Sequence, residues 1–419
     1  MRSRLLTSLA TEAGGTDDPE TWARAVCRSA SHFARQGHTK QALQAIDSVR
    51  SKFARNLTPS IGAWLMLAEG VLHFFQEDIS AAFDRTRRSY AIAKAANLRA
   101  VVPTCAAWMA LIEFNALRYE QMALHLEEAF AVAAPDDHQA LARASLVLAD
   151  ALHFAGDFKA ARPFYERTRL HATAEGDEAT LSAMLHNVAA FRVGNVRMAD
   201  AVGIAAPEEA KRAMMEANSA LNFDAAIGTA SFTMLVPLLR GQLLTVERKY
   251  AEAEKVLLAI DRAALEAKSV PLLLVDLGWC YAAQGKLEAA KMLADEVPAL
   301  LTSETHIDEI AFINARLAQV AMSRSEFDTA ANCRTAAVAA IAVHNDVQQK
   351  LASRLASVVE ISRTPPKAQE KKPGSRRATR PTSRRSIFLT AYFLSEMAML
   401  RRDSRQSLRT QEQGQQVPS

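Results

Sequence analysis

The sequence predicts an all-α protein: a right-handed α-solenoid of about eight helical hairpins, followed by a disordered basic tail. The composition is the first observation behind this prediction. Only 15 glycines and 14 prolines occur among 419 residues, and 49% of the residues are apolar, which favours helix over a turn-rich β fold. A short turn motif then recurs at nearly constant spacing along the chain. Finally, the composition changes sharply at Arg363.

The turn motif reads G-x-Φ-x-x-A, and "GDFKAA" at Gly156 is a clear example. We call its first residue the turn anchor. The anchors are Gly37, Glu77, Leu117, Gly156, Gly194, Arg248, Gly285 and Ser325, at steps of 40, 40, 39, 38, 54, 37 and 40 residues. Self-similarity at a fixed period is the signature of stacked hairpins. We therefore expect one helix to end before each anchor and another to begin after it.

Two further positions keep step with the anchors and let paired helices approach closely. Five residues after the anchors stand Ala42, Ala82, Met122, Ala161, Ala199, Ala253, Ala290 and Ala330. Seven residues before them stand Ala30, Gly70, Ala110, Ala149, Asn187, Gly241, Gly278 and Ala318.

The long interval between the fifth and sixth anchors departs from the period. There Gly203 and Pro207 should break one helix and begin another, so we expect a bend. After the eighth hairpin, a helix following Val343 is expected to cap the array.

These residues resemble the tetratricopeptide repeats. The stretch "LGWCYAAQGKLEAA" carries Leu277, Gly278, Tyr281, Gly285 and Ala290 at that family's spacing. The unit of about 40 residues exceeds the family's usual length of about 34 and is similar to the arrays of MalT-like transcription activators. No helix-turn-helix pattern follows the array, so a complete DNA-binding activator is not expected.

The expected organisation has five parts. They are a flexible N-terminus (1–19), the repeat array with its capping helix (20–362), a disordered basic linker (363–385), a short apolar helix (386–400) and a disordered polar tail (401–419). Residues 363–419 hold 13 Lys and Arg against 4 Asp and Glu, a net charge of +9. Because the whole chain is +4, residues 1–362 carry +4 − 9 = −5.

Three interpretations of the apolar segment "SIFLTAYFLSEMAML" at Ser386–Leu400 stay open. It can pack on its own array, lie on a membrane surface beside its basic flanks, or dock on another protein. A non-native C-terminus is a further alternative. The basic run favours weak, non-specific contact with polyanions and no specific nucleic acid.

The chain lacks the common catalytic and cofactor motifs. It has no G-x-G-x-x-G, P-loop, H-E-x-x-H or G-x-S-x-G sequence, and its four cysteines lie far apart. His125 and Glu128 match half of a diiron helix, but no second Glu-x-x-His unit completes it. We therefore expect no enzyme, cofactor or metal site. Neither a signal-peptide core nor a membrane span occurs in residues 1–362, which predicts a cytoplasmic protein.

The resemblance implies a concave groove lined by the first helix of each hairpin. Residues one, four and five positions after the small Gly or Ala should point into it. The candidates for a peptide groove are Asn115, Asp150, His153, Arg192, Gln242, Trp279 and Gln319, beside Arg35, Phe74, Phe75 and Phe154. Scattered polar residues also occur on an ordinary solvated face, and a tryptophan such as Trp279 more often packs into the core between units.

The favoured function is protein binding, by a scaffold or regulator that holds a peptide or partner helix in the concave groove. The alternative is a sensory module of a bacterial signalling or transcription system, which responds to a small ligand or peptide and acts through its basic tail.

Overall fold

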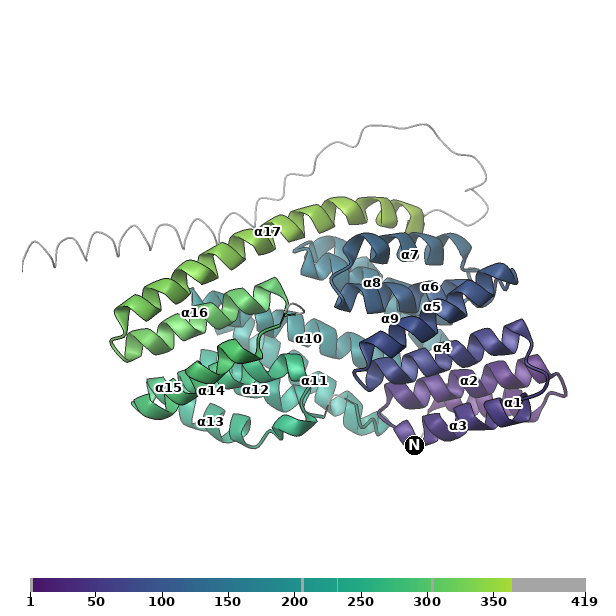
Figure 1. The fold of residues 1–419 in the computed structure, drawn as a ribbon, viewed down its shortest axis with the longest axis horizontal. Helices are drawn as coiled ribbons and strands as arrows, with labels where there is room; N and C mark the ends of the chain where they lie inside the picture. The colour runs from purple at the N-terminus through teal and green to yellow at the C-terminus, as the bar shows by residue number, and fades with distance from the viewer. Residues whose placement is uncertain (1–2, 205–206, 232, 303–304, 364–419) are drawn as a thin grey trace, which may run out of the picture.

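A computed structural model describes residues 3–204, 207–231, 233–302 and 305–363, and every regular element within them is helical. The prediction of an all-α hairpin array is confirmed (Figure 1). The predicted linker, apolar helix and polar tail lie outside the described residues from residue 364 onward. They stay predictions.

The helices form eight consecutive hairpins. The first four are α2 (Pro19–Arg35) with α3 (Thr39–Lys52), α4 (Pro59–Phe75) with α5 (Ile79–Ala95), α6 (Val102–Asn115) with α7 (Tyr119–Val132), and α8 (His138–Phe154) with α9 (Phe158–Glu175). The last four are α10 (Glu178–Ala201) with α11 (Pro207–Ile227), α12 (Leu235–Val246) with α13 (Tyr250–Leu258), α14 (Val270–Ala283) with α15 (Leu287–Glu296), and α16 (Ile307–Ser323) with α17 (Phe327–Arg363). Short 3₁₀ turns η1 (Arg262–Ala264), η2 (Ala267–Ser269) and η3 (Val297–Leu300) link the later helices.

The same left-handed turn closes the first helix of every hairpin. The turn residues with positive φ are Gly37, Glu77, Leu117, Gly156, Gly203, Arg248, Gly285 and Ser325, with values from 59° to 87°. At each one the next backbone N–H donates to the carbonyl five residues earlier, as from Asp157 to Leu152 at 2.9 Å. This is the Schellman closure of a helix C-terminus, and it explains why the motif recurs.

The fifth turn lies at Gly203, and our assignment of it to Gly194 is wrong. Gly194 is inside α10, where φ is not positive and a Cβ atom would meet nothing within 4 Å. The helix instead ends at Ala201, and Pro207 opens α11. The predicted break at Gly203 and Pro207 is thus the hairpin turn itself. The uneven steps of 38 and 54 residues become 47 and 45.

Two further expectations need correction. The N-terminus was expected to be flexible over residues 1–19, but Arg4–Gly14 form α1, which buries Leu5 and Leu9. Apolar residues four apart give that segment a face that packs on α2. The expected capping helix after Val343 is not separate, because α17 runs unbroken through 37 residues.

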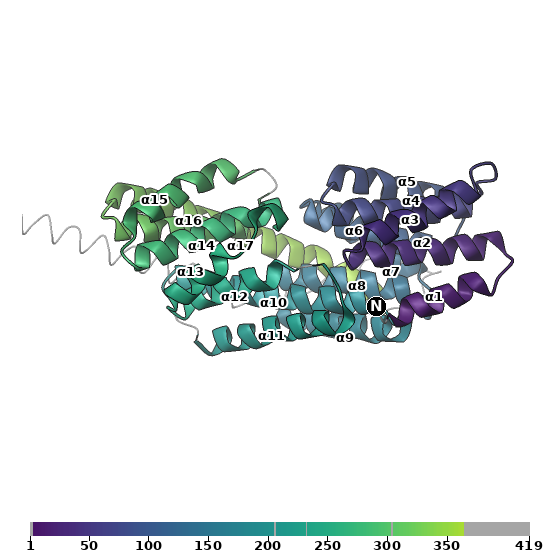
Figure 2. The same ribbon diagram turned by 90° about the horizontal axis from the view of Figure 1, so that it is seen from below.

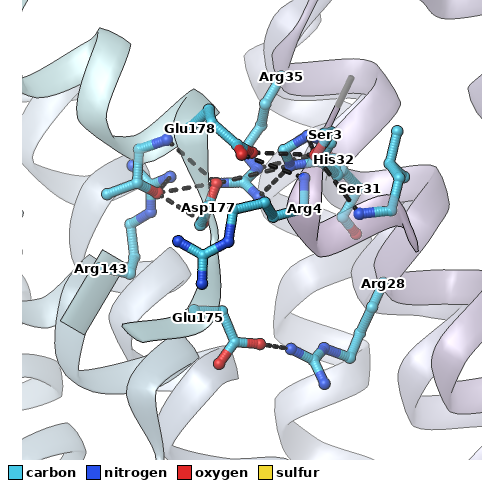
Figure 3. A network of polar contacts seen from close by, with 12 residues as sticks. Ser3, Arg4, Arg28, Ser31, His32, Arg35, Arg143, Glu175, Asp177 and Glu178 are labelled. Atoms are coloured by element: carbon cyan, nitrogen blue, oxygen red, sulfur yellow. Dashed lines mark hydrogen bonds and ion pairs between the residues drawn. The ribbon is translucent and has the colours of Figure 1, made fainter. Parts of the chain in front are cut away.

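Contacts across a long sequence separation join the first hairpin to the middle of the chain. The Arg35 Nη1 lies 2.7 Å from the Asp177 Oδ2, and Thr180 Oγ1 accepts from the same nitrogen at 2.8 Å (Figure 3). Asp177 also accepts from the backbone N–H of Thr180, so it caps α10 while it binds Arg35. The residue that follows α2 makes another long-range contact: the Gln36 carbonyl accepts from the backbone N–H of Ala230, which follows α11, at 2.9 Å.

The long helix α17 makes a second such contact. Its first part pairs with α16, and its second part reaches α7 and α8 (Figure 1). Seen from below, α8–α11 lie between the early and the late hairpins (Figure 2). The array is therefore held together by non-local contacts as well as by packing between neighbours.

Candidate functional site

Helix α10 contributes residues to two side-chain clusters. One lies between α8, α9 and α10, and the other lies between α10, α14 and α16. In stacked hairpins the first helices line the inner face. The α8–α10 cluster consists of Asp150, His153, Tyr165, Asn187, Phe191 and Arg192. The α10–α16 cluster consists of Arg197, Asp200, Asp276, Trp279, Phe312, Arg316 and Gln319.

Asp150 is at the centre of the α8–α10 cluster. Its Oδ1 accepts from the Tyr165 hydroxyl at 2.9 Å, and its Oδ2 accepts from the Asn187 amide at 2.7 Å. Only 3% of Asp150 is exposed. Burial raises the pKa of its carboxyl to about 7 against the opposing effect of these two hydrogen bonds. The carboxyl therefore joins three helices and is not free for a ligand.

The accessible part of this cluster is aromatic and basic. The His153 ring stacks on Phe191 with centroids 4.5 Å apart, and its Nδ1 lies 3.1 Å from the Tyr165 hydroxyl. Burial, with a smaller effect of Arg192, lowers the pKa of His153 to about 4, so the ring is neutral near pH 7. Arg192 is half-buried and bridges Glu209 and Glu216 of α11 at 2.8 and 2.6 Å.

The α10–α16 cluster is a network of buried ion pairs. Arg316 is fully buried, and its Nη2 lies 2.8 Å from Asp200 while its Nε lies 3.5 Å from Asp276. Arg197 pairs with Asp276 as well. Each buried arginine thus has an aspartate partner, as charges removed from water require, and the more exposed Arg248 also lies 2.7 Å from Asp200. Together the buried residues join hairpins five, seven and eight.

Aromatic rings complete this cluster. The Arg197 guanidinium lies 3.9 Å from the Phe312 ring centroid, and Arg316 lies 5.6 Å from that of Trp279. Among the described residues, the Trp279 Nε1 is buried and has no hydrogen-bond partner. The Trp279 ring is half-buried, so the exposed part of its face, and not its enclosed N–H, is what a ligand could contact.

The structure brings together most of the predicted groove residues. Asp150, His153 and Arg192 meet in the α8–α10 cluster. Trp279 and Gln319 lie in the α10–α16 cluster, where Gln319 Oε1 accepts from Arg316 and its Nε2 donates to the Ala201 carbonyl at 3.0 Å.

Other predicted groove residues are buried or already bound to neighbouring residues, so a ligand could not contact them. The Asn115 side-chain amide donates to the Leu111 carbonyl within α6 at 3.0 Å. Gln242 is 2% exposed on α12, and Asp150 is similarly enclosed, so neither offers an open surface. Arg35 is committed to Asp177, while Phe74 and Phe75 pack on Trp108, and Phe154 packs on Phe114.

The sequence-based prediction missed the four charged residues of the α10–α16 cluster. A signal for two of them was present, because Asp276 and Arg316 each stand two residues before the small residue of adjacent units, Gly278 and Ala318. A charge at that position interrupts otherwise apolar helices. Our prediction considered only the residues one, four and five positions after the small Gly or Ala.

Comparison with known proteins agrees with the architecture. The tetratricopeptide repeat family matches residues 142–167, which cover most of α8 and the first half of α9. The crystal structure of a Rap protein complexed with competence and sporulation factor is similar, with a TM-score of 0.53 and 12% identity over 81% of this chain and 94% of that one. The apo form of RapI gives a TM-score of 0.44 at 10% identity over 80% and 90% of the two chains. The search of curated proteins found no match.

The fold and the repeat therefore define a tetratricopeptide-type helical repeat protein. Within the described ranges, no three His, Cys, Asp or Glu side chains are grouped to hold a metal ion. The helices of that same part of the chain are all too short or too polar to cross a membrane.

Proposed function

We propose that the inner face along α10 binds a peptide or an extended segment of a partner protein. The observation that carries this proposal is that α10 lies beside two sets of half-buried side chains: its own Phe191 and Arg192 with His153 of α8, and, through Arg197, the cluster that contains the Trp279 ring of α14. A peptide needs donors and acceptors for its backbone and flat rings for its side chains. The fold it shares with a Rap protein solved with competence and sporulation factor supports the same use.

The buried charges serve this function indirectly. Because Arg316 and Asp276 are fully enclosed, they fix the positions of α14 and α16 and do not contact a ligand. A rigid receptor surface loses little conformational entropy of its own when a peptide binds to it. Substitution of Arg316 or Asp276 should therefore lower the stability of the fold, whereas substitution of Arg192 or Trp279 should weaken binding.

Affinity capture from the source cell's lysate tests the proposal with the full chain as bait. Partners that Arg192→Ala and Trp279→Phe lose should remain bound to Arg162→Ala and Trp22→Phe. Arg162 is an exposed arginine on α9 with a glutamate partner, and Trp22 lies on α2 away from α10, so each is a matched control. Equal capture by all four variants would contradict the proposal.

The opposite charges of the body and the tail favour a second candidate, a ligand- or peptide-responsive module that acts through the tail. Residues 363–419 carry +9 and residues 1–362 carry −5. Capture with the full chain and with a chain ending at residue 362 separates the two. A scaffold retains the same partners at the same affinity, and a tail-driven regulator loses or changes them.

A further inference from the structure

Arg143 of α8 is a buried arginine without a carboxylate partner. The described part of the chain holds four buried arginines, which are Arg35, Arg143, Arg197 and Arg316. The other three are each paired with an aspartate. Arg143 is 5% exposed, and no Asp or Glu of the described residues lies within ion-pair distance of it. A charge that leaves water without a partner is costly, so the fold contains one buried positive charge that it does not compensate.

The contacts of Arg143 leave part of its donor edge free. Its Nη2 donates to the Thr180 Oγ1 at 3.3 Å, which is a long hydrogen bond, and that neutral hydroxyl itself donates to Asp177 at 2.8 Å. The guanidinium lies over the Trp108 ring, 4.4 Å from the centroid. Among the described residues, its Nε and Nη1 have no hydrogen-bond partner, and neither belongs to the atoms that the fold encloses completely. Because guanidinium N–H groups point outward in its plane, they can meet a ligand while Trp108 covers the face.

The carboxylates of the surrounding network are already bound. Their partners in Figure 3 are Arg35 for Asp177, Arg28 for Glu175, and the Ser3 hydroxyl for Glu178. Burial, with a smaller effect of the like charge on Arg35, lowers the pKa of Arg143 to about 9. The guanidinium is still charged at neutral pH. The network therefore lacks one negative charge at the free edge of Arg143.

We propose that Arg143 is the binding site for the carboxylate group of a small anionic ligand. The parallel N–H groups of an arginine match the two oxygens of a carboxylate, which a chloride ion does not offer. One unpaired positive charge is balanced by a monoanion, so a carboxylate fits better than a doubly charged phosphate. Because so little of Arg143 is exposed, a small molecule reaches it more easily than a polypeptide chain does. The site does not require a peptide to bind along α10.

Thermal melts of the full chain in sodium acetate test the proposal. Acetate is the probe, and it replaces sodium chloride at constant ionic strength, so that charge screening stays the same. We expect the Tm of the unmodified chain to rise with acetate, because a ligand of the folded state stabilises it. Arg143→Met should abolish this rise. The matched control is Arg162→Met, which removes an exposed arginine of α9 and should show the same rise as the unmodified chain.

Melts in chloride alone separate a ligand site from a structural role. If the fold does not compensate the guanidinium, Arg143→Met should melt at the temperature of the unmodified chain or higher. Arg35→Met should melt at a lower temperature, because it leaves Asp177 unpaired. A loss in Arg143→Met as large as that in Arg35→Met would overturn the proposal. A second variant, Arg143→Lys, keeps the charge without the fork and should raise the half-saturating acetate concentration about tenfold.

Other anions test the class of ligand. Equal melts of the unmodified chain in acetate and chloride, or stronger stabilisation by phosphate than by acetate, would overturn the carboxylate site. N-acetylated trialanine carries a carboxylate at the end of a peptide, and its C-terminal amide is the control. Binding of the free acid no tighter than that of acetate would support a small ligand. If the free acid binds about tenfold more tightly than acetate and the amide does not bind, the carboxylate belongs to a peptide terminus, and the small ligand is overturned.

Discussion

The Arg35 Nη1 and the Asp177 Oδ2 lie 2.7 Å apart although 142 residues separate them in the sequence. Both side chains are buried, and His32 Nδ1 lies 3.5 Å from the other Asp177 oxygen. The pair connects the first hairpin to the turn that precedes α10, the helix that carries the proposed binding face. Its integrity therefore bears on both the fold and the site.

Breaking this pair should be costly. Removing one partner of a buried ion pair leaves the other charge without compensation, so Arg35→Met should lower the free energy of unfolding by about 3–5 kcal/mol. Arg162→Met removes an exposed pair with Glu166 and should cost less than about 1 kcal/mol. Urea unfolding followed by circular dichroism measures both. Similar small losses for the two variants would contradict the structural role of Arg35.

The same carboxylate predicts a dependence of stability on pH. Burial alone raises the pKa of Asp177, but Arg35 and His32 lower it more, so the net pKa is well below its usual value. A depressed carboxyl pKa stabilises the fold above the unfolded-state value of about 3.9, and the contribution is lost as pH falls toward the folded-state pKa. Unfolding titrations should show that the penalty of Asp177→Asn shrinks below about pH 4. A constant penalty across that range would be inconsistent with this shift.

The corrected fifth turn makes opposite predictions for two glycines of the same segment. Gly194 is in the interior of α10 with open space around its Cα, so Gly194→Ala should stabilise by about 0.5–1 kcal/mol. Gly203 has a φ of 87°, and Gly203→Ala should destabilise by about 1–2 kcal/mol. Thermal melts of the two variants would refute the turn at Gly203 if their order were reversed.

Close helix contact distinguishes two other glycines. A Cβ at Gly70 would overlap the Thr86 Oγ1, so Gly70→Ala should destabilise by about 1–3 kcal/mol. A Cβ at Gly278 would lie 3.6 Å from the Ala290 carbonyl oxygen, an ordinary contact, so Gly278→Ala should be neutral or stabilising. Chemical denaturation compares them directly. Equal losses would mean that both positions need glycine for the same reason.

Local chemistry made the hairpins predictable from sequence. Anchors such as Gly156 and Gly285 adopt positive φ, and the alanines five residues later, such as Ala161 and Ala290, are buried almost completely. The fifth anchor was misplaced because Gly194 and Ala199 fit the motif by coincidence. The correct signal, Gly203 before Pro207, was visible as a helix break.

The site was less predictable because distant segments decide which inner-face residues are open. Asp150 stands at one of the positions predicted to face the groove, yet Tyr165 and Asn187 from neighbouring helices enclose it. Arg35 was expected in the groove and instead binds Asp177, from the turn before α10. A periodic pattern describes one unit and its neighbours, and it does not contain contacts between residues more than a hundred positions apart.

Hydrogen exchange of the full chain, with and without its captured partner, tests the central claim most directly. Binding along α10 should slow exchange in residues 187–197 and around Trp279, where the half-buried contacts lie, and Arg192→Ala should abolish that protection. Helices α3 and α5 of the early hairpins should exchange at unchanged rates. Protection confined to those helices, with none on α10 or α14, would contradict the account.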